Sequence, residues 1–208
     1  MTKIPSEMRL FSPEGDRLYL SASERAQFLL SAKEEERENR VFCSMLHYTG
    51  ARPSEVLELT ADRISLSENA IVFRSLKKRK TDNKGNVKLP AYRSVPVPKR
   101  VIDEMDLVFN VRKVQKQGKE ASSLLWPMSR ATAWRMVKRV MLRANIDGKR
   151  STSKGLRHGF GVAMLSGEKP LPINILRDLM GHNDTKITEI YLQAIGQEKR
   201  KLVMQAWD

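Results

Sequence analysis

The chain has 208 residues, of which 38 are Lys or Arg and 24 are Asp or Glu, so its formal net charge is +14 and its isoelectric point lies near 10.1. This excess is typical of a protein that binds a polyanion, and nucleic acid is the leading partner; a basic surface that only aids solubility is the alternative. No apolar stretch approaches the roughly 20 residues that span a bilayer, and the single cysteine excludes an intrachain disulfide. We therefore expect a cytoplasmic protein with no membrane segment.

The first 60 residues predict an arm followed by helices. Residues 1–20 are mixed in character and predict an irregular N-terminal arm, and Ser21 and Glu24 have the spacing of a capping box that begins a helix. A second helix is expected over about residues 36–48. It would end at a glycine.

A short helix is expected directly after that glycine. Gly50 suits a helix C-terminus, and Pro53 suits the first turn of the next helix. Arg52 therefore lies at a helix junction, from which its side chain can reach out of the core.

Three β-rich segments follow, at residues 64–66, 70–73 and 92–97, and they predict a small antiparallel sheet. Between the last two lies a polar, basic stretch that predicts an exposed hairpin tip. Its cations Lys78, Arg79 and Lys80 are candidate DNA contacts.

The remainder of the chain is expected to be helical. The predicted helices cover about residues 99–115, 129–144, 155–166, 173–180, 184–193 and 197–207. The fold class is therefore mixed α+β and mostly helical. In the helix over 129–144, Arg135, Lys138 and Arg139 lie largely off the apolar face and can follow a DNA backbone, although a merely solvated face is the alternative. The apolar tail helix over 197–207 docks either on its own core or on a neighbouring subunit.

Two arginines, a histidine and a tyrosine are the parts needed to hold and attack a phosphodiester without a metal. The planar guanidinium forks of Arg52 and Arg157 fit two non-bridging phosphate oxygens. Tyr191 is the candidate nucleophile, and His182 in neutral form can accept its proton. Nearby cations are expected to favour the phenolate form of the tyrosine. A lysine of the 77–80 segment is the candidate general acid for the leaving oxygen.

These motifs resemble the catalytic domain of the tyrosine recombinases, the phage integrase family. The resemblance rests on Thr-Gly-x-Arg-x-x-Glu at residues 49–55, the basic hairpin, Leu156-Arg157-His158, Leu-Met-Gly-His at 179–182 and the downstream Tyr191, and it covers roughly residues 18 to 200. It implies that Arg52 and Arg157 bind the phosphate, that Glu55 steadies the first arginine, and that Tyr191 forms a 3′-phosphotyrosine and frees a 5′-hydroxyl. No metal, cofactor or ATP is implied.

Two positions match the family less closely. Lys154 stands where a histidine is most often found; it can donate to the phosphate but cannot act as a neutral base. The hairpin lysine is ambiguous among Lys77, Lys78 and Lys80, and counting forward from residues 64–66 favours Lys77. Because side chains alternate along a strand, Lys78 and Lys80 would share the opposite face.

The resemblance also bears on domain organisation and partners. We expect residues 21–208 to form the catalytic domain, without the N-terminal core-binding domain that is typical of the family. The expected partners are double-stranded DNA, three further copies in a tetramer on DNA joined through the tail helix, and an accessory DNA-binding protein. Localisation would then be at the nucleoid.

Three activities remain open from the sequence. The preferred one is site-specific DNA recombination. A nicking and closing activity like that of type IB topoisomerases is the nearest enzymatic alternative, and a non-catalytic DNA-binding regulator with the same fold is the alternative from another class.

Overall fold

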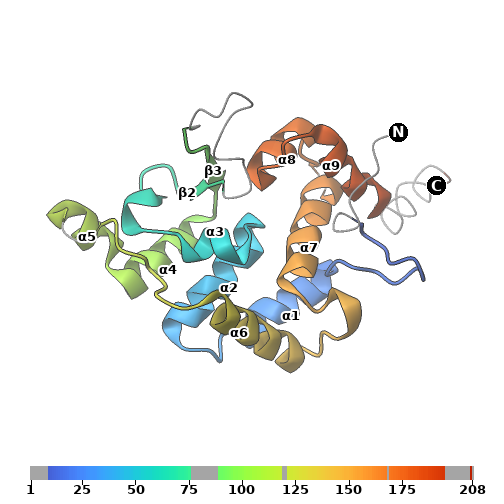
Figure 1. Ribbon diagram of the computed structural model, residues 1–208, viewed down its shortest axis with the longest axis horizontal. Helices are drawn as coiled ribbons and strands as arrows, with labels where there is room; N and C mark the ends of the chain where they lie inside the picture. The colour runs from blue at the N-terminus through green and yellow to red at the C-terminus, as the bar shows by residue number, and fades with distance from the viewer. Residues whose placement is uncertain (1–8, 76–88, 119–120, 168, 195–206, 208) are drawn as a thin grey trace.

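The computed structural model describes residues 9–75, 89–118, 121–167, 169–194 and 207 (Figure 1). These ranges are mostly helical with one small sheet, which confirms the predicted fold class. The elements are α1 (Ala22–Ala32), α2 (Arg37–Thr49), α3 (Pro53–Leu57), β1 (Ile64–Ser65), β2 (Ala70–Arg74), β3 (Tyr92–Pro96), α4 (Lys99–Phe109), α5 (Val111–Gln117), α6 (Arg130–Arg143), α7 (Ser153–Ser166), α8 (Ile173–Met180) and α9 (Thr185–Glu189), with short 3₁₀ turns at Ala61–Arg63, Gly148–Arg150 and Ile190–Ala194 (η4).

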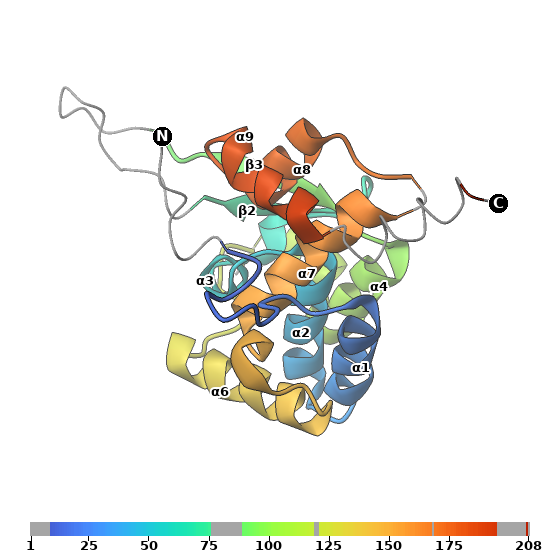
Figure 2. The same cartoon turned by 90° about the vertical axis from the view of Figure 1, so that its right-hand side faces the viewer.

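Helix α2 lies at the centre of the larger core. Its apolar run from Val41 to Leu46 is buried, and the helix packs against α1, α4 and α7. Figures 1 and 2 show α6 at one end of this helical layer and α8 with α9 at the other. The site described below lies between α3, α7 and the C-terminal end of α8.

The predicted helix boundaries near the N-terminus are confirmed. Ser21 caps α1 and forms both bonds of the capping box with Glu24. Gly50 ends α2 in the left-handed conformation, with φ 59°, and a side chain there would collide with the ring of Phe160. Pro53 is the first residue of α3, so Arg52 occupies the junction between the two helices, as expected.

The sheet is three-stranded and antiparallel in the order β1-β2-β3, as predicted. Its register places Arg93 of β3 opposite Phe73 of β2. Because side chains alternate along a strand, Arg93 and Val95 both point into the protein, and both are buried. The predicted hairpin tip over residues 77–86 lies outside the described residues.

Residues 99–115 are helical, as predicted, but they belong to two helices, α4 and α5, that meet at Asn110. Asn110 takes a left-handed conformation, with φ 52°, ends α4 and begins α5. Asparagine tolerates this region of backbone space better than most residues, and Asp106 fixes the break by accepting hydrogen bonds from Arg112. The predicted tail helix over 197–207 falls almost entirely outside the described residues.

A smaller core lies apart from the main one. It groups Leu10 of the N-terminal arm with Phe160, Leu165, Leu176, Met180, Ile190 and Tyr191. Tyr191 is thus a core residue in this structure, where it packs on α7. None of the helices in the described ranges combines the length and the apolar character that crossing a bilayer demands.

Helix α7 carries several site residues, and its first turn depends on one side chain. The hydroxyl of Thr152 accepts a hydrogen bond of 2.9 Å from the backbone N–H of Gly155. We expect Thr152→Ala to lower the free energy of unfolding by about 1 kcal/mol, measured by chemical denaturation. Thr152→Ser keeps the hydroxyl and serves as the control; equal losses in both variants would contradict the capping role.

Candidate active site

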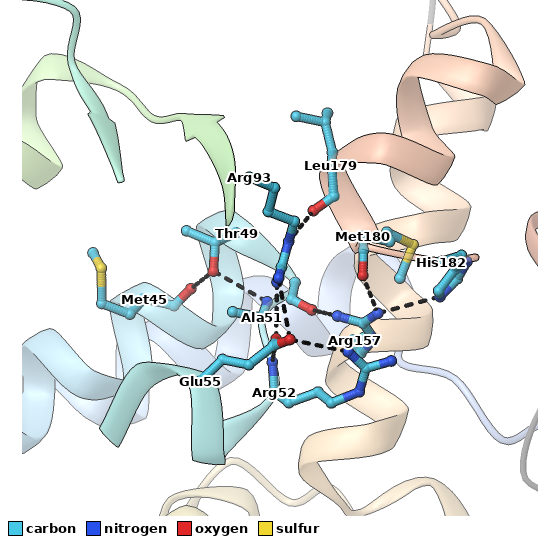
Figure 3. Close-up of polar contacts among 11 residues, drawn as sticks. Met45, Thr49, Ala51, Arg52, Glu55, Arg93, Arg157, Leu179, Met180 and His182 are labelled. Atoms are coloured by element: carbon cyan, nitrogen blue, oxygen red, sulfur yellow. Dashed lines mark hydrogen bonds and ion pairs between the residues drawn. The ribbon is translucent and has the colours of Figure 1, made fainter. Parts of the chain in front are cut away.

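The first arginine of the site is tied to a buried carboxylate. Glu55 accepts a hydrogen bond from the backbone N–H of Arg52 at 2.8 Å and another from its Nη1 at 3.0 Å (Figure 3). The Glu55 side chain is 1% exposed, whereas the Arg52 side chain is 22% exposed. Burial raises the pKa of Glu55, but hydrogen bonds and charge from Arg93 outweigh it and leave the pKa below its ordinary value. Glu55 is therefore ionised and orients Arg52 from beneath.

The second arginine is held by backbone carbonyls. Arg157 donates through Nη1 to the carbonyl of Gly50 at 2.5 Å and through Nη2 to that of Met180 at 2.6 Å (Figure 3). Burial, followed by the charge of Arg52, lowers the pKa of Arg157 to about 9. The guanidinium remains charged at neutral pH, and it joins the end of α2 to the end of α8.

His182 meets Arg157 directly. Its Nε2 lies 3.2 Å from Nη2 of Arg157, and its Nδ1 lies 3.0 Å from the hydroxyl of Thr188. Because arginine can only donate, Nε2 must be the acceptor, so the proton lies on Nδ1 and faces Thr188. Burial and the charge of Arg157 lower the pKa of His182 to about 3. The ring is therefore a neutral imidazole, as the proton-acceptor hypothesis requires.

Tyr191 lies beside this cluster, and its hydroxyl is paired with His158. The ring is parallel to that of His182, with 6.3 Å between the ring centroids. The hydroxyl lies 3.1 Å from Nδ1 of His158, and the side chain is fully buried. The ring also covers Gly161, where a Cβ would come within 2.6 Å of it. The tyrosine side chain is thus buried against α7.

Neighbouring cations favour the phenolate of Tyr191, as expected, but burial outweighs them in this conformation. Burial raises the pKa of the phenol to about 12, although Arg157 and Arg52 act in the opposite direction. Desolvation outweighs the attraction because the Tyr191 side chain is fully buried. His158 itself is neutral, since burial and the charge of Lys154 lower its pKa to about 3.

Of the candidate catalytic lysines, only Lys154 lies within the described residues. Lys154 lies in the first turn of α7, one turn before Arg157, and is exposed. Lys77, Lys78, Arg79 and Lys80 all lie outside the described residues. Within the described ranges, no group of three or more His, Cys, Asp or Glu side chains is placed to share a metal ion.

The basic residues of α6 are partly committed to contacts within the protein. Arg139 pairs with Glu35, and Lys138 donates to the carbonyl of Ser151 at 2.6 Å. Arg135 is exposed, and its described side-chain contact is with Thr132 at 3.5 Å. Of the three candidate DNA contacts on this helix, Arg135 is the one whose charge faces solvent without a carboxylate among the described residues.

Three residues of the site were given no role by the sequence analysis. Arg93 holds Glu55, His158 holds the Tyr191 hydroxyl, and Gly161 makes room for its ring. A signal existed for the first, because the alternation of β3 places Arg93 on the same face as two apolar residues, and a charge on that face needs a partner. His158 stands in the motif Leu156-Arg157-His158, but no local signal gives the roles of His158 and Gly161, since their contacts are made only in the fold.

Known sequences show what this chain is similar to. The profile described as the phage integrase family matches residues 19–198. Proteins named tyrosine recombinase XerD from Staphylococcus haemolyticus and Staphylococcus aureus are each 26% identical to this chain, over 80% of its length. The matched part is 54% of each of them, so the chain spans about half the length of the curated relatives it matches.

Solved structures show the same fold. The XerA recombinase matches 93% of this chain and 66% of its own, with a TM-score of 0.71 and 22% identity. XerH bound to palindromic difH substrate in a post-cleavage complex matches 91% of this chain and 53% of its own, with a TM-score of 0.70 and 18% identity. The catalytic domain of bacteriophage HP1 integrase matches 91% of this chain and 95% of its own, with a TM-score of 0.57 and 20% identity.

The matched profile takes in α1 to η4 and every described residue of the site, from Arg52 to Tyr191. The solved relatives share that arrangement of elements at low sequence identity. On the extent of this match, the chain belongs to the phage integrase family.

Proposed function

We propose that this protein is a site-specific DNA recombinase that cuts and rejoins DNA through a 3′-phosphotyrosine intermediate. The observation that carries the proposal is the convergence of four side chains on one region from separate parts of the fold. They are Arg52 at the junction of α2 and α3, Arg157 of α7, His182 after α8 and Tyr191 of η4. Relatives named tyrosine recombinase support the same activity.

In the proposed reaction, the Tyr191 oxygen attacks the phosphorus and gives its proton to neutral His182, and the bond from phosphorus to the 5′ oxygen breaks. The 5′ oxygen takes up a proton, and a lysine of the 77–80 segment is the proposed donor. The arginines stabilise the charge that develops on the equatorial oxygens. The phosphotyrosine conserves the energy of the broken diester, so the reverse attack by a 5′-hydroxyl reseals the strand without ATP. Lys154 would add a donor to the phosphate.

Attack requires Tyr191 to leave the position described above. Its hydroxyl is bonded to His158, and its ring is covered by the smaller core. The short helix α9 and the 3₁₀ turn η4 carry the tyrosine, so a shift of this segment would bring the phenol towards Arg157. In the same movement the phenol would lose its burial and keep the attraction of the two arginines, which lowers its pKa.

Double-stranded DNA is the proposed partner. XerH was solved with its difH substrate, and the Tn1549 integrase was solved with transposon right end DNA. The net charge of +14 suits such a partner. Recombination would take four copies around two duplexes, in the cytoplasm at the nucleoid, and an accessory DNA-binding protein would assist site binding.

The first prediction concerns the covalent intermediate. The protein is incubated, with a chelator present, with a pool of random-sequence duplexes that are nicked so that the cleaved fragment diffuses away. We expect labelled DNA to stay attached to denatured protein, and Tyr191→Phe to abolish the attachment. Attachment that survives in Tyr191→Phe would contradict the assignment of the nucleophile. Specific DNA binding without any attachment would favour the regulator, and nicking and closing without strand exchange would favour the topoisomerase-like activity.

The second prediction concerns the shape of the Arg157 side chain. Lysine keeps the charge but cannot serve two carbonyls, an imidazole and a phosphate with one planar fork. We expect Arg157→Lys to slow single-turnover cleavage on the order of 100-fold or more. Arg177→Lys is the control, since Arg177 pairs only with the neighbouring exposed Asp178 in the described acid–base contacts. A wild-type rate for a folded Arg157→Lys would remove the clamp from the mechanism.

The third prediction concerns the storage of Tyr191. A Cβ on residue 161 would overlap the phenol ring, so Gly161→Ala must displace it. We expect the pKa of Tyr191 to fall from about 12 towards its ordinary value of about 10. The phenol of the variant then ionises at lower pH because it reaches water. The measurement is the ultraviolet titration difference between Gly161→Ala and the same variant with Tyr191→Phe.

Gly167→Ala is the matched control for this substitution, because a Cβ there meets its nearest described atom at 3.6 Å. Its tyrosine titration should equal that of the wild type. An unchanged titration in Gly161→Ala would show that the ring does not depend on the space above this glycine.

A further inference from the structure

The guanidinium group of Arg93 forms hydrogen bonds within the protein through all three of its nitrogens. Its Nη1 and Nη2 donate to the two carboxylate oxygens of Glu55 at 3.1 and 2.8 Å, and its Nε donates to the carbonyl of Leu179 at 2.8 Å (Figure 3). The guanidinium carbon lies 5.1 Å from the centroid of the Phe73 ring, and the side chain is 7% exposed. With all three nitrogens bonded inside the protein, Arg93 is not placed to contact DNA.

One consequence concerns the first arginine of the site. Both oxygens of Glu55 are shared between Arg93 and Arg52, because Oε1 accepts from the two side chains and Oε2 accepts from Arg93 and from the Arg52 backbone. Arg93 thereby fixes the rotamer of Glu55 and neutralises much of its charge. Arg52 is held by a single side-chain bond to this carboxylate, which leaves the rest of its fork for an anion.

The other consequence concerns the turn that carries His182. Arg93 and Arg157 bind the consecutive carbonyls of Leu179 and Met180 at the end of α8. The next residue, Gly181, is left-handed with φ 64°, and a Cβ there would lie 3.2 Å from Nη1 of Arg93. The turn therefore closes around the Arg93 guanidinium, and this places His182 against Arg157.

We propose that Arg93 is a positioning residue of the phosphate site, which fixes Glu55 beneath Arg52 and the Leu179 carbonyl ahead of His182. The inference rests on the proposed function, whose chemistry it deepens. Arg93 is the second residue of β3, the strand that follows the basic segment of residues 76–88 in sequence. A displacement of β3 would move Arg93, and through Glu55 and the Leu179 carbonyl it would shift both Arg52 and the turn that meets Arg157.

The test compares Arg93→Met with Arg143→Met. Arg143 makes the same kind of contacts far from the site, since it donates to the carboxylate of Glu35 and to the carbonyl of Ser31, both at 2.9 Å. Both variants should lose stability. We expect only Arg93→Met to slow covalent attachment of the nicked duplex pool, on the order of 10- to 100-fold, with little change in DNA binding measured by gel shift.

A second substitution separates positioning from general destabilisation. Without Arg93, the carboxylate of Glu55 is free to hold the whole Arg52 fork, so Glu55→Gln should restore part of the rate lost in Arg93→Met. If Arg93 only stabilises the fold, the double variant is no faster than Arg93→Met. That result would overturn the proposal.

A third readout does not depend on DNA. The ring-nitrogen resonances of His182 are assigned by comparison with the spectrum of His182→Gln. They should shift in Arg93→Met, because the hydrogen bond between His182 and Arg157 loosens, and they should stay unchanged in Arg143→Met. Arg93→Lys replaces Arg93→Met if the latter does not fold. A folded Arg93 variant with wild-type resonances and a wild-type rate refutes the inference. If the wild type itself forms no covalent complex, the proposed function fails, while the His182 resonances still decide whether Arg93 positions the turn.

Discussion

The buried guanidinium of Arg157 is the constraint on which the rest of the site depends. It bonds to the ends of two helices, at Gly50 and Met180, and to the imidazole of His182. A hydrogen bond to a charged group contributes about 1.5–3 kcal/mol, so the Arg157 guanidinium holds these segments together. The helices of the larger core and the α8 turn therefore meet at one side chain. The geometry of that meeting point sets where Arg52, His182 and Tyr191 lie.

Local rules explain much of the fold. The capping box at Ser21 and Glu24, the helix end at Gly50 and the helix start at Pro53 are all visible in the sequence, because each depends on residues within one turn. The break at Asn110 was not predicted, since neither Gly nor Pro marks it and the surrounding pattern stays helical. Its cause is a left-handed asparagine supported by Asp106.

The site was predictable to a different degree. The order of motifs indicated Arg52, Arg157, His182 and Tyr191, and the structure brings these four together. It did not indicate how they are held. The bond from Tyr191 to His158 joins residues 33 positions apart, and the niche over Gly161 exists only when η4 packs on α7. Such contacts follow from tertiary packing. They leave no periodic pattern and no fixed spacing in a single sequence, so they could not be predicted from it. The sequence indicated the cations that lower the pKa of Tyr191 but not the burial that raises it.

The charge balance of the site explains why it suits a phosphodiester. Three guanidinium groups, those of Arg52, Arg93 and Arg157, surround one buried carboxylate, that of Glu55, which leaves a surplus of two positive charges. This surplus helps to keep His182 neutral and adds to the burial that lowers the pKa of Arg157. An anion placed against Arg52 and Arg157 would relieve that repulsion, and it would do so most strongly where water is excluded. The same surplus favours a phenolate once Tyr191 leaves its niche, because the cations already lower its pKa and only burial opposes them. In the proposed reaction, binding of the phosphate and activation of the tyrosine would therefore both follow from one unbalanced charge.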